Sequence, residues 1–141
     1  MRLAAVLTLV AAPAFAETPE FFLDMTFPPE TVERLTGLGE KVVISVLYFG
    51  EPAEGSSMPL DDMGQVLLVE ENITIEPVDQ TVTLGAALAD APLGEVTRAR
   101  MNINFLPAGE GTEEVTLWCG VIDAFVDEAD GKTAPVTCQA Y

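Results

Sequence analysis

Side chains that could carry out catalysis are scarce in this sequence, because histidine is absent from all 141 positions. Without imidazole, the chain has no Ser-His-Asp or Cys-His arrangement and no His-ligated metal site. Carboxylate chemistry remains, such as a glycosidase pair, but among 23 acidic residues neighbours such as Glu70 and Glu71 arise by chance. We interpret such pairs as solvated edge charges. The sequence therefore favours a protein that is not an enzyme and needs no cofactor, with a carboxylate-dependent enzyme as the alternative.

The only two cysteines, Cys119 and Cys138, are predicted to form a disulfide. An even number without C-x-x-C spacing indicates a structural bond rather than a redox centre. If the last two strands pair antiparallel, the cysteines lie opposite each other when the connection is centred between Glu128 and Ala129. Alternatively, the final strand joins the second sheet and the bond links the sheets. Closing a loop of about 20 residues should stabilise the fold by roughly 3 kcal/mol.

Two arginines lie on the same face of a predicted strand and form a candidate contact for a ligand or partner. Arg98 and Arg100 are two of only five basic residues that follow position 16. Guanidinium groups bind carboxylates through paired hydrogen bonds, so these side chains could receive an acidic ligand. The interpretation that we prefer is that they pair with acids on neighbouring strands.

Two other clusters contain residue types that bind metal ions. Met58 and Met63 lie in an irregular stretch, and thioether ligands suit copper(I). Asp127 and Asp130 bring carboxylates to a turn, as calcium requires, but the spacing is not that of an EF-hand and Lys132 follows closely. We interpret the methionines as packing beneath their loop and the acids as part of a hairpin turn. The sequence therefore predicts no metal site.

The first 16 residues have the pattern of a secretory signal peptide. One basic residue precedes an apolar run over residues 3–12, and small residues at positions 14 and 16 precede Glu17. The run is about half of the roughly 20 residues that an α-helix needs to cross a bilayer. We therefore predict a cleaved signal peptide at 1–16, leaving residues 17–141 as one all-β domain. The periplasm is the expected compartment, with secretion to the medium as the alternative.

The part that remains after cleavage is strongly acidic. The whole chain has a formal charge of −17, and loss of Arg2 leaves five basic and 23 acidic residues, or −18. Such a charge repels phosphate backbones and anionic lipid, so we expect no nucleic acid partner and no membrane insertion after cleavage. The partners that we expect are a basic protein surface or a small ligand.

Alternating apolar and polar residues predict an all-β fold. The segment 21–27 alternates with period two, 41–49 is apolar on both faces, and 96–106 has one buried and one wet face. Further β-rich segments lie at 65–69 and 72–75, as two short strands or one bent strand, and at 80–84, 114–126 and 136–141, with one or two helical turns at 30–35. Seven or eight strands separated by turns predict a single β-sandwich, immunoglobulin-like or transthyretin-like in architecture.

The longest irregular stretch runs from Gly50 to Gly64 and is the expected functional loop. The sequence as a whole predicts an exported acidic β-sandwich module with a binding or structural function in the cell envelope. It would act through this loop or through an exposed sheet edge. A glycosidase-like enzyme that uses carboxylates and a protein that binds divalent cations are the alternatives.

Overall fold

The computed structural model describes residues 17–109 and 115–141, so the predicted signal peptide lies outside the described residues. The strands in this part are β1 (Phe21–Thr26), β2 (Val42–Gly50), β3 (Val66–Ile75), β4 (Gln80–Leu84), β5 (Arg100–Pro107), β6 (Leu117–Trp118), β7 (Ile122–Phe125), β8 (Thr133–Thr137) and β9 (Gln139–Ala140). The helices are α1 (Pro29–Gly37), α2 (Val126–Ala129) and the 3-10 turns η1 (Ala86–Asp90) and η2 (Leu93–Glu95). None of these helices is long and apolar enough to cross a membrane.

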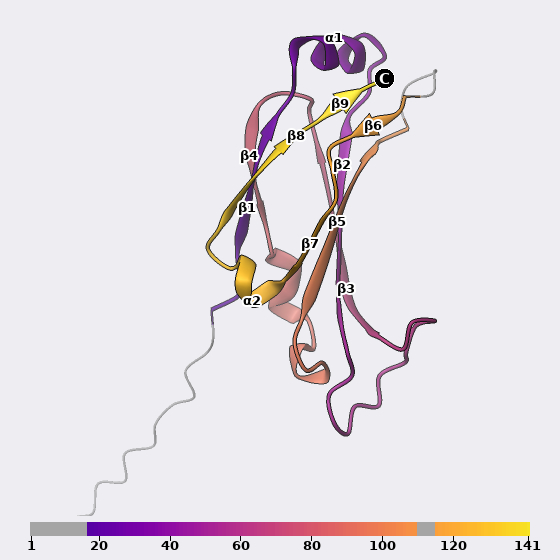
Figure 1. Cartoon of the computed structure of the whole chain (residues 1–141), viewed down its shortest axis with the longest axis vertical. Helices are drawn as coiled ribbons and strands as arrows, with labels where there is room; N and C mark the ends of the chain where they lie inside the picture. Colours follow the sequence, from indigo (N-terminus) through magenta and orange to yellow (C-terminus); the bar gives the residue numbers. More distant parts are fainter. Residues whose placement is uncertain (1–16, 110–114) are drawn as a thin grey trace, which may run out of the picture.

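The strands form two main sheets, and the predicted all-β sandwich is confirmed. One sheet has the order β4-β1-β8, the other has the order β3-β2-β5-β7, and β6 and β9 form a separate pair. Figure 1 shows the two sheets facing each other along the long axis, with α1 and the β6-β9 pair at one end. The loop between β2 and β3 extends from the opposite end.

Strand β2 is central in its sheet because it pairs with β3 on one side and with β5 on the other. Its residues alternate between buried and half-buried, as expected for a strand with apolar side chains on both faces. The pairing with β3 shifts between Tyr48 and Phe49, which marks a β-bulge. The segments predicted at 65–69 and 72–75 are therefore one bent strand, which is one of the two arrangements that the sequence allowed.

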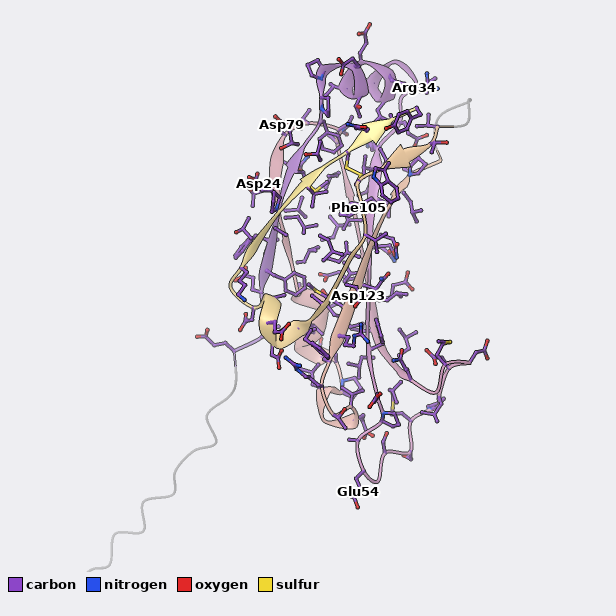
Figure 2. All side chains as sticks on the ribbon, viewed as in Figure 1. Asp24, Arg34, Glu54, Asp79, Phe105 and Asp123 are labelled. Carbon is purple, nitrogen blue, oxygen red and sulfur yellow. A yellow bond between two sulfur atoms is a disulfide. The ribbon has the colours of Figure 1, made fainter. Side chains whose placement is uncertain are left out.

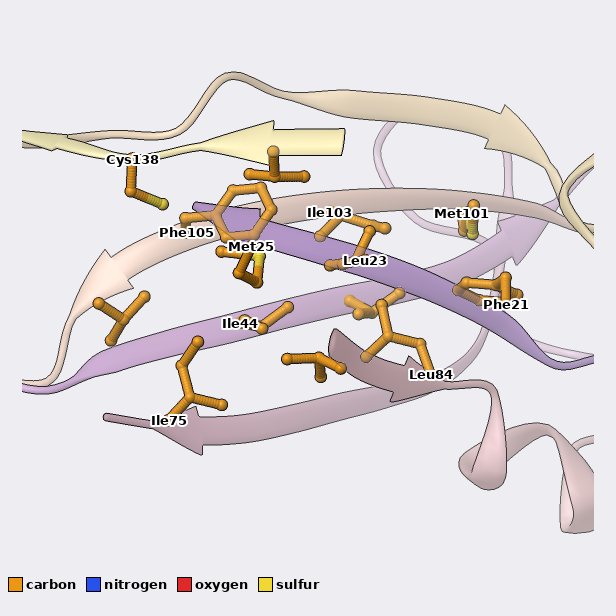
Figure 3. Close-up of a cluster of buried hydrophobic side chains, with 14 of the residues drawn as sticks. Phe21, Leu23, Met25, Ile44, Ile75, Leu84, Met101, Ile103, Phe105 and Cys138 are labelled. Carbon is orange, nitrogen blue, oxygen red and sulfur yellow. The ribbon is translucent and has the colours of Figure 1, made fainter. Parts of the chain in front are cut away.

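The core lies between the sheets and takes alternate residues from both. In β5, Met101, Ile103 and Phe105 are 3%, 0% and 7% exposed, as the predicted alternation over 96–106 requires. Figure 2 shows Asp24 at the surface and Phe105 between the sheets, and Figure 3 shows the buried cluster in detail. Each large apolar side chain buried in this way contributes roughly 1.5–3 kcal/mol to stability.

The β-rich segment predicted over 114–126 is not one continuous strand. Its described part contains two short strands, β6 and β7, on either side of Gly120. Gly120 has a φ of 84°, a left-handed conformation that is foreign to a β-strand. Because β6 pairs with β9 and β7 pairs with β5, the chain changes partner at this glycine. The apolar pattern continues on both sides of the glycine and so does not reveal the break.

The predicted hairpin turn around Asp127 and Asp130 is also wrong. β7 pairs with β5, whereas β8 pairs in parallel with β1, so this connection crosses from one sheet to the other. Buried Val126 begins the short helix α2, and the N–H of Gly131 then donates to the carbonyl of Glu20 at 2.7 Å. These two contacts direct the chain toward β1 rather than back along β7.

The predicted disulfide between Cys119 and Cys138 is confirmed, with an S–S distance of 2.08 Å. β6 and β9 pair antiparallel with Trp118 opposite Gln139, so the cysteines are the next pair in the same register. Beyond the bond, the two chain segments enter different sheets, one as β7 and the other as β8. The disulfide therefore joins an antiparallel pair at the point where the sheets separate, which combines the two arrangements that the sequence left open.

Candidate functional site

The base of the predicted functional loop, residues 50–64, is held in a fixed position. The N–H of Ala53 donates to the carbonyl of Glu95 at 2.8 Å. The N–H of Thr97 donates to the carbonyl of Glu51 at 3.0 Å. These bonds continue β-type pairing past the end of β2 and attach the loop to the segment that precedes β5.

The other end of the loop is ordered by one aspartate. Oδ1 of Asp61 accepts hydrogen bonds from the N–H of Met63 at 2.8 Å and the N–H of Gln65 at 2.9 Å. The N–H of Asp61 donates to the carbonyl of Gln65 at 2.7 Å. Short polar side chains stabilise turns through such local bonds, and this turn leads the chain into β3. The Met63 side chain remains 83% exposed at the surface.

Four side chains form a row across the outer face of the β3-β2-β5-β7 sheet, and we call them the outer row. The strand registers place Leu67 opposite Phe49, Phe49 opposite Arg100, and Arg100 opposite Phe125. The guanidinium carbon of Arg100 lies 5.7 Å from the centre of the Phe49 ring and 5.4 Å from that of Phe125. Arg98, just before β5, lies 3.6 Å from the Phe125 ring centre. Cations within about 6 Å of a ring centre are attracted to it, so the aromatic rings help to fix both arginines.

Arg98 and Arg100, the predicted ligand contacts, are both paired within the chain. Arg98 donates to both carboxylate oxygens of Asp127 at 2.9 Å and to Glu128 at 3.0 Å. Arg100 donates to Asp123 at 2.9 Å. The hydrogen bonds between Arg98 and Asp127 raise the pKa of the arginine and lower the pKa of the aspartate. Both guanidinium groups are therefore engaged by carboxylates, three in all, and contact of these arginines with an acidic ligand stays a prediction.

Two hollows of about 250 Å³ each lie on this outer face and share Gln65 as a lining residue. The polar hollow is lined by Glu51, Thr97, Arg98, Arg100 and Phe125 besides Gln65. The apolar hollow is lined by Leu47, Phe49, Asp61, Leu67 and Asn102 besides Gln65. The outer row and the end of the loop thus form one continuous uneven surface.

Three exposed apolar side chains lie on the loop and at the start of β3, and one of them, Leu67, lines the apolar hollow. Leu60, Met63 and Leu67 are 56%, 83% and 51% exposed, and we call these three residues the loop patch. Exposed carboxylates accompany the loop patch along the same loop and along β3, and we call them the rim: Glu51, Glu54, Asp61, Asp62 and Glu70. Exposed apolar groups with a polar rim are typical of interaction surfaces.

The four residues whose types suit metal binding lie in different surroundings in the structure. Met58 is half-buried and Met63 is exposed, so the expectation that both pack beneath the loop is wrong for Met63. Asp127 is held by an arginine, whereas Oδ1 of Asp130 accepts the N–H of Glu20 at 3.0 Å. Within residues 17–109 and 115–141, no group of three or more His, Cys, Asp or Glu side chains is placed to hold a metal ion.

Sequence reasoning missed a polar pair inside the sandwich. The hydroxyl of Tyr48, which is fully buried, donates to Oε1 of Glu71 at 2.6 Å, and the N–H of Gly85 donates to the same oxygen at 3.1 Å. Glu71 is only 9% exposed, so its interpretation as a solvated edge charge is wrong. Burial, together with Glu71, raises the pKa of Tyr48. The available signal was the period-two alternation, which places Glu71 on the same face as buried Ile75.

No protein-family model, curated protein or solved structure matches this chain. Its function is therefore inferred from the chemistry of the outer face. The loop patch favours contact with another apolar surface, and the acids around it favour a surface of positive charge.

Proposed function

We propose that this chain is an exported, non-enzymatic binding module that holds a basic segment of a partner protein on its outer face. The observation that carries this proposal is the loop patch, whose exposed apolar side chains alternate along the chain with the exposed carboxylates of the rim. A segment in which Lys or Arg alternates with apolar residues matches both features. Its apolar side chains would contact Leu67 and the apolar hollow, and its cations would face the rim.

The apolar contact supplies affinity in this proposal. Leu60, Met63 and Leu67 each expose half or more of their surface in the free protein. Full burial of such a side chain is worth roughly 1.5–3 kcal/mol, so covering the exposed half of Leu67 contributes about 1 kcal/mol. The neighbouring hollow of about 250 Å³ offers space for one apolar side chain of the partner.

The charge of the protein attracts the partner toward it and speeds their association. The acids at the rim carry no ion pair with a described residue, whereas both arginines of this face are balanced by carboxylates. A formal charge of −18 on residues 17–141 attracts a cationic partner at long range. Salt screens such attraction over about 8 Å at physiological ionic strength, so binding should weaken as salt rises.

Export is part of the proposal and is supported by two features. The first 16 residues have the composition of a signal peptide, and Cys119 and Cys138 form a disulfide of the kind that persists in oxidising compartments. We propose the periplasm as the compartment, with release to the medium as the alternative. The mass of the protein recovered after export should correspond to a chain that begins at Glu17.

Calorimetry with defined peptides tests the binding proposal. A peptide of alternating lysine and leucine should bind residues 17–141, and the same peptide with glutamate in place of lysine should not. Leu67→Ser should weaken binding about fivefold, which corresponds to about 1 kcal/mol. Leu106→Ser is the matched control, because Leu106 is equally exposed, at 51%, and lies on β5 at the far end of the same face.

Three results would contradict the proposal. The first is absence of binding by the lysine-leucine peptide at millimolar concentration, and the second is equal binding of both peptides. The third is an equal loss of affinity in Leu67→Ser and Leu106→Ser, since that would place the contact away from the loop patch.

A further inference from the structure

A third hollow lies on the inner side of β5, between the two sheets, and is independent of the outer face. β7 is the last strand of one sheet and β8 is the last strand of the other, and the two do not pair. The space between them has a volume of about 250 Å³, and we call it the seam cavity. Figure 3 shows Phe21, Leu23, Met101 and Ile103 pointing into the core, and these side chains form its floor.

Small side chains create the seam cavity. Ala124 of β7 lies opposite Met101, and Ala134 of β8 lies opposite Leu23, so both edge strands present a methyl group where the inner strands present a large side chain. Ala129 of α2 also lines the cavity. The three alanines are half-buried, which leaves the cavity open at its side.

The volume and the lining define the size of a ligand. An apolar cavity of about 150 Å³ inside a protein stays dry and binds benzene, which has six carbon atoms. By proportion, about 250 Å³ accommodates roughly ten carbon atoms. A space that lies between two unpaired edge strands suits an unbranched chain better than a fused ring system.

The mouth of the seam cavity has one cation whose side chain is not paired within the described ranges. Lys132, Glu128 and Thr133 line the mouth. Glu128 accepts a hydrogen bond from Arg98 at 3.0 Å, so this carboxylate is held at Arg98, which it shares with Asp127. Lys132 forms no ion pair with residues 17–109 or 115–141, in contrast to Lys41, which pairs with an acid. An amphipathic ligand would thus find an apolar interior and a positive charge at the entrance.

We infer that the seam cavity binds an unbranched medium-chain carboxylate, with the alkyl chain between the sheets and the head group at Lys132. Thr133 also lines the cavity, next to Lys132 in the chain. The protein is acidic as a whole, but screening limits that repulsion to about 8 Å at physiological salt, so a direct contact with Lys132 decides the preference. Asp130, the nearest acid in sequence, has one oxygen engaged by the N–H of Glu20.

Calorimetry with three ligands of equal chain length tests this inference. Octanoate should bind at least about fivefold more tightly than octanol, and octylamine should bind most weakly. Lys132→Gln should reduce octanoate affinity to the level of octanol and leave octanol affinity unchanged. Ala124→Leu fills the cavity, so it should abolish binding of all three ligands while the unfolding temperature stays equal or rises, because filling a cavity removes its cost.

Controls separate this site from the proposed peptide site. Leu67→Ser should leave octanoate binding unchanged, and Ala124→Leu should leave binding of the basic peptide unchanged. If Ala124→Leu does not fold, Lys132→Gln still tests the head-group contact without altering packing. The inference is overturned if octanoate does not bind, if octylamine or octanol binds as tightly as octanoate, or if Lys132→Gln leaves octanoate affinity unchanged.

Discussion

The bond between Tyr48 and Glu71 offers the sharpest test of the buried structure. Tyr48 is fully buried, Glu71 is 9% exposed, and the hydroxyl lies 2.6 Å from the carboxylate oxygen. Tyr48→Phe preserves the ring but leaves the carboxylate with one fewer donor. A hydrogen bond to a charged group is worth about 1.5–3 kcal/mol, and a buried acceptor that loses its partner costs a similar amount. We therefore expect a loss of about 2–3 kcal/mol, a large share of the 5–15 kcal/mol typical of a domain.

Urea unfolding at pH 7 measures this loss. Tyr141→Phe is the matched control, because its hydroxyl also donates to a side chain at 2.6 Å but the residue is 64% exposed. We expect the control to change stability by less than about 0.5 kcal/mol. Glu71→Gln and the double variant complete a cycle whose coupling should reach about 1 kcal/mol or more. A loss below about 0.5 kcal/mol for Tyr48→Phe would refute the assigned role of the pair.

The same bond predicts a dependence of stability on alkaline pH. Burial raises the pKa of Tyr48 in the folded protein, whereas the unfolded tyrosine keeps a pKa near 10. The stability that the neutral hydroxyl contributes is therefore complete below about pH 10. Above it, the unfolded state loses the proton first and stability falls by up to about 1.4 kcal/mol per pH unit. Unfolding curves of Tyr48→Phe should lack this contribution, and an identical slope in both proteins would contradict it.

Two further substitutions test the backbone. Gly85 has a φ of +116° and a Cβ there would collide with the carbonyl oxygen of Pro19, so Gly85→Ala should cost more than about 2 kcal/mol in urea unfolding. Gly94→Ala, at a position with open space, is the control and should change stability by less than about 1 kcal/mol. Replacing Cys119 and Cys138 by serine should cost about 3 kcal/mol through the unfolded chain, and a loss below about 1 kcal/mol would contradict the disulfide's stabilising role.

Local patterns in the sequence predicted the sandwich because most of its strands have side chains of clearly different polarity on their two faces. The alternation in 96–106 identified Met101, Ile103 and Phe105 as one face, and these three side chains are buried. The two cysteines were predicted as a pair from their number and spacing, and the register of β6 and β9 agrees with that prediction. Such features depend on residues close in sequence or on a covalent bond.

The features that the sequence did not reveal depend on pairing between distant segments. The outer row exists because β3, β2, β5 and β7 align Leu67, Phe49, Arg100 and Phe125 side by side, although up to 76 positions separate them in the chain. The burial of Glu71 likewise depends on Tyr48 and on a backbone N–H that is 14 residues away. The pattern of residues within each segment does not show how distant strands align, so these contacts were not predicted from the sequence.

Strand β5 contributes to both proposed binding sites, because its successive side chains face opposite sides of the sheet. Arg100 lies in the outer row, and the next residue, Met101, forms part of the floor of the seam cavity. A shift of one residue in the pairing of β5 would exchange its two faces, moving the arginine into the core and the methionine to the surface. The ion pair of Arg100 with Asp123 and the pairing of Met101 with Ala124 both depend on the same alignment of β5 with β7. One register therefore determines the outer face and the inner cavity together, although the two sites take ligands of different chemistry.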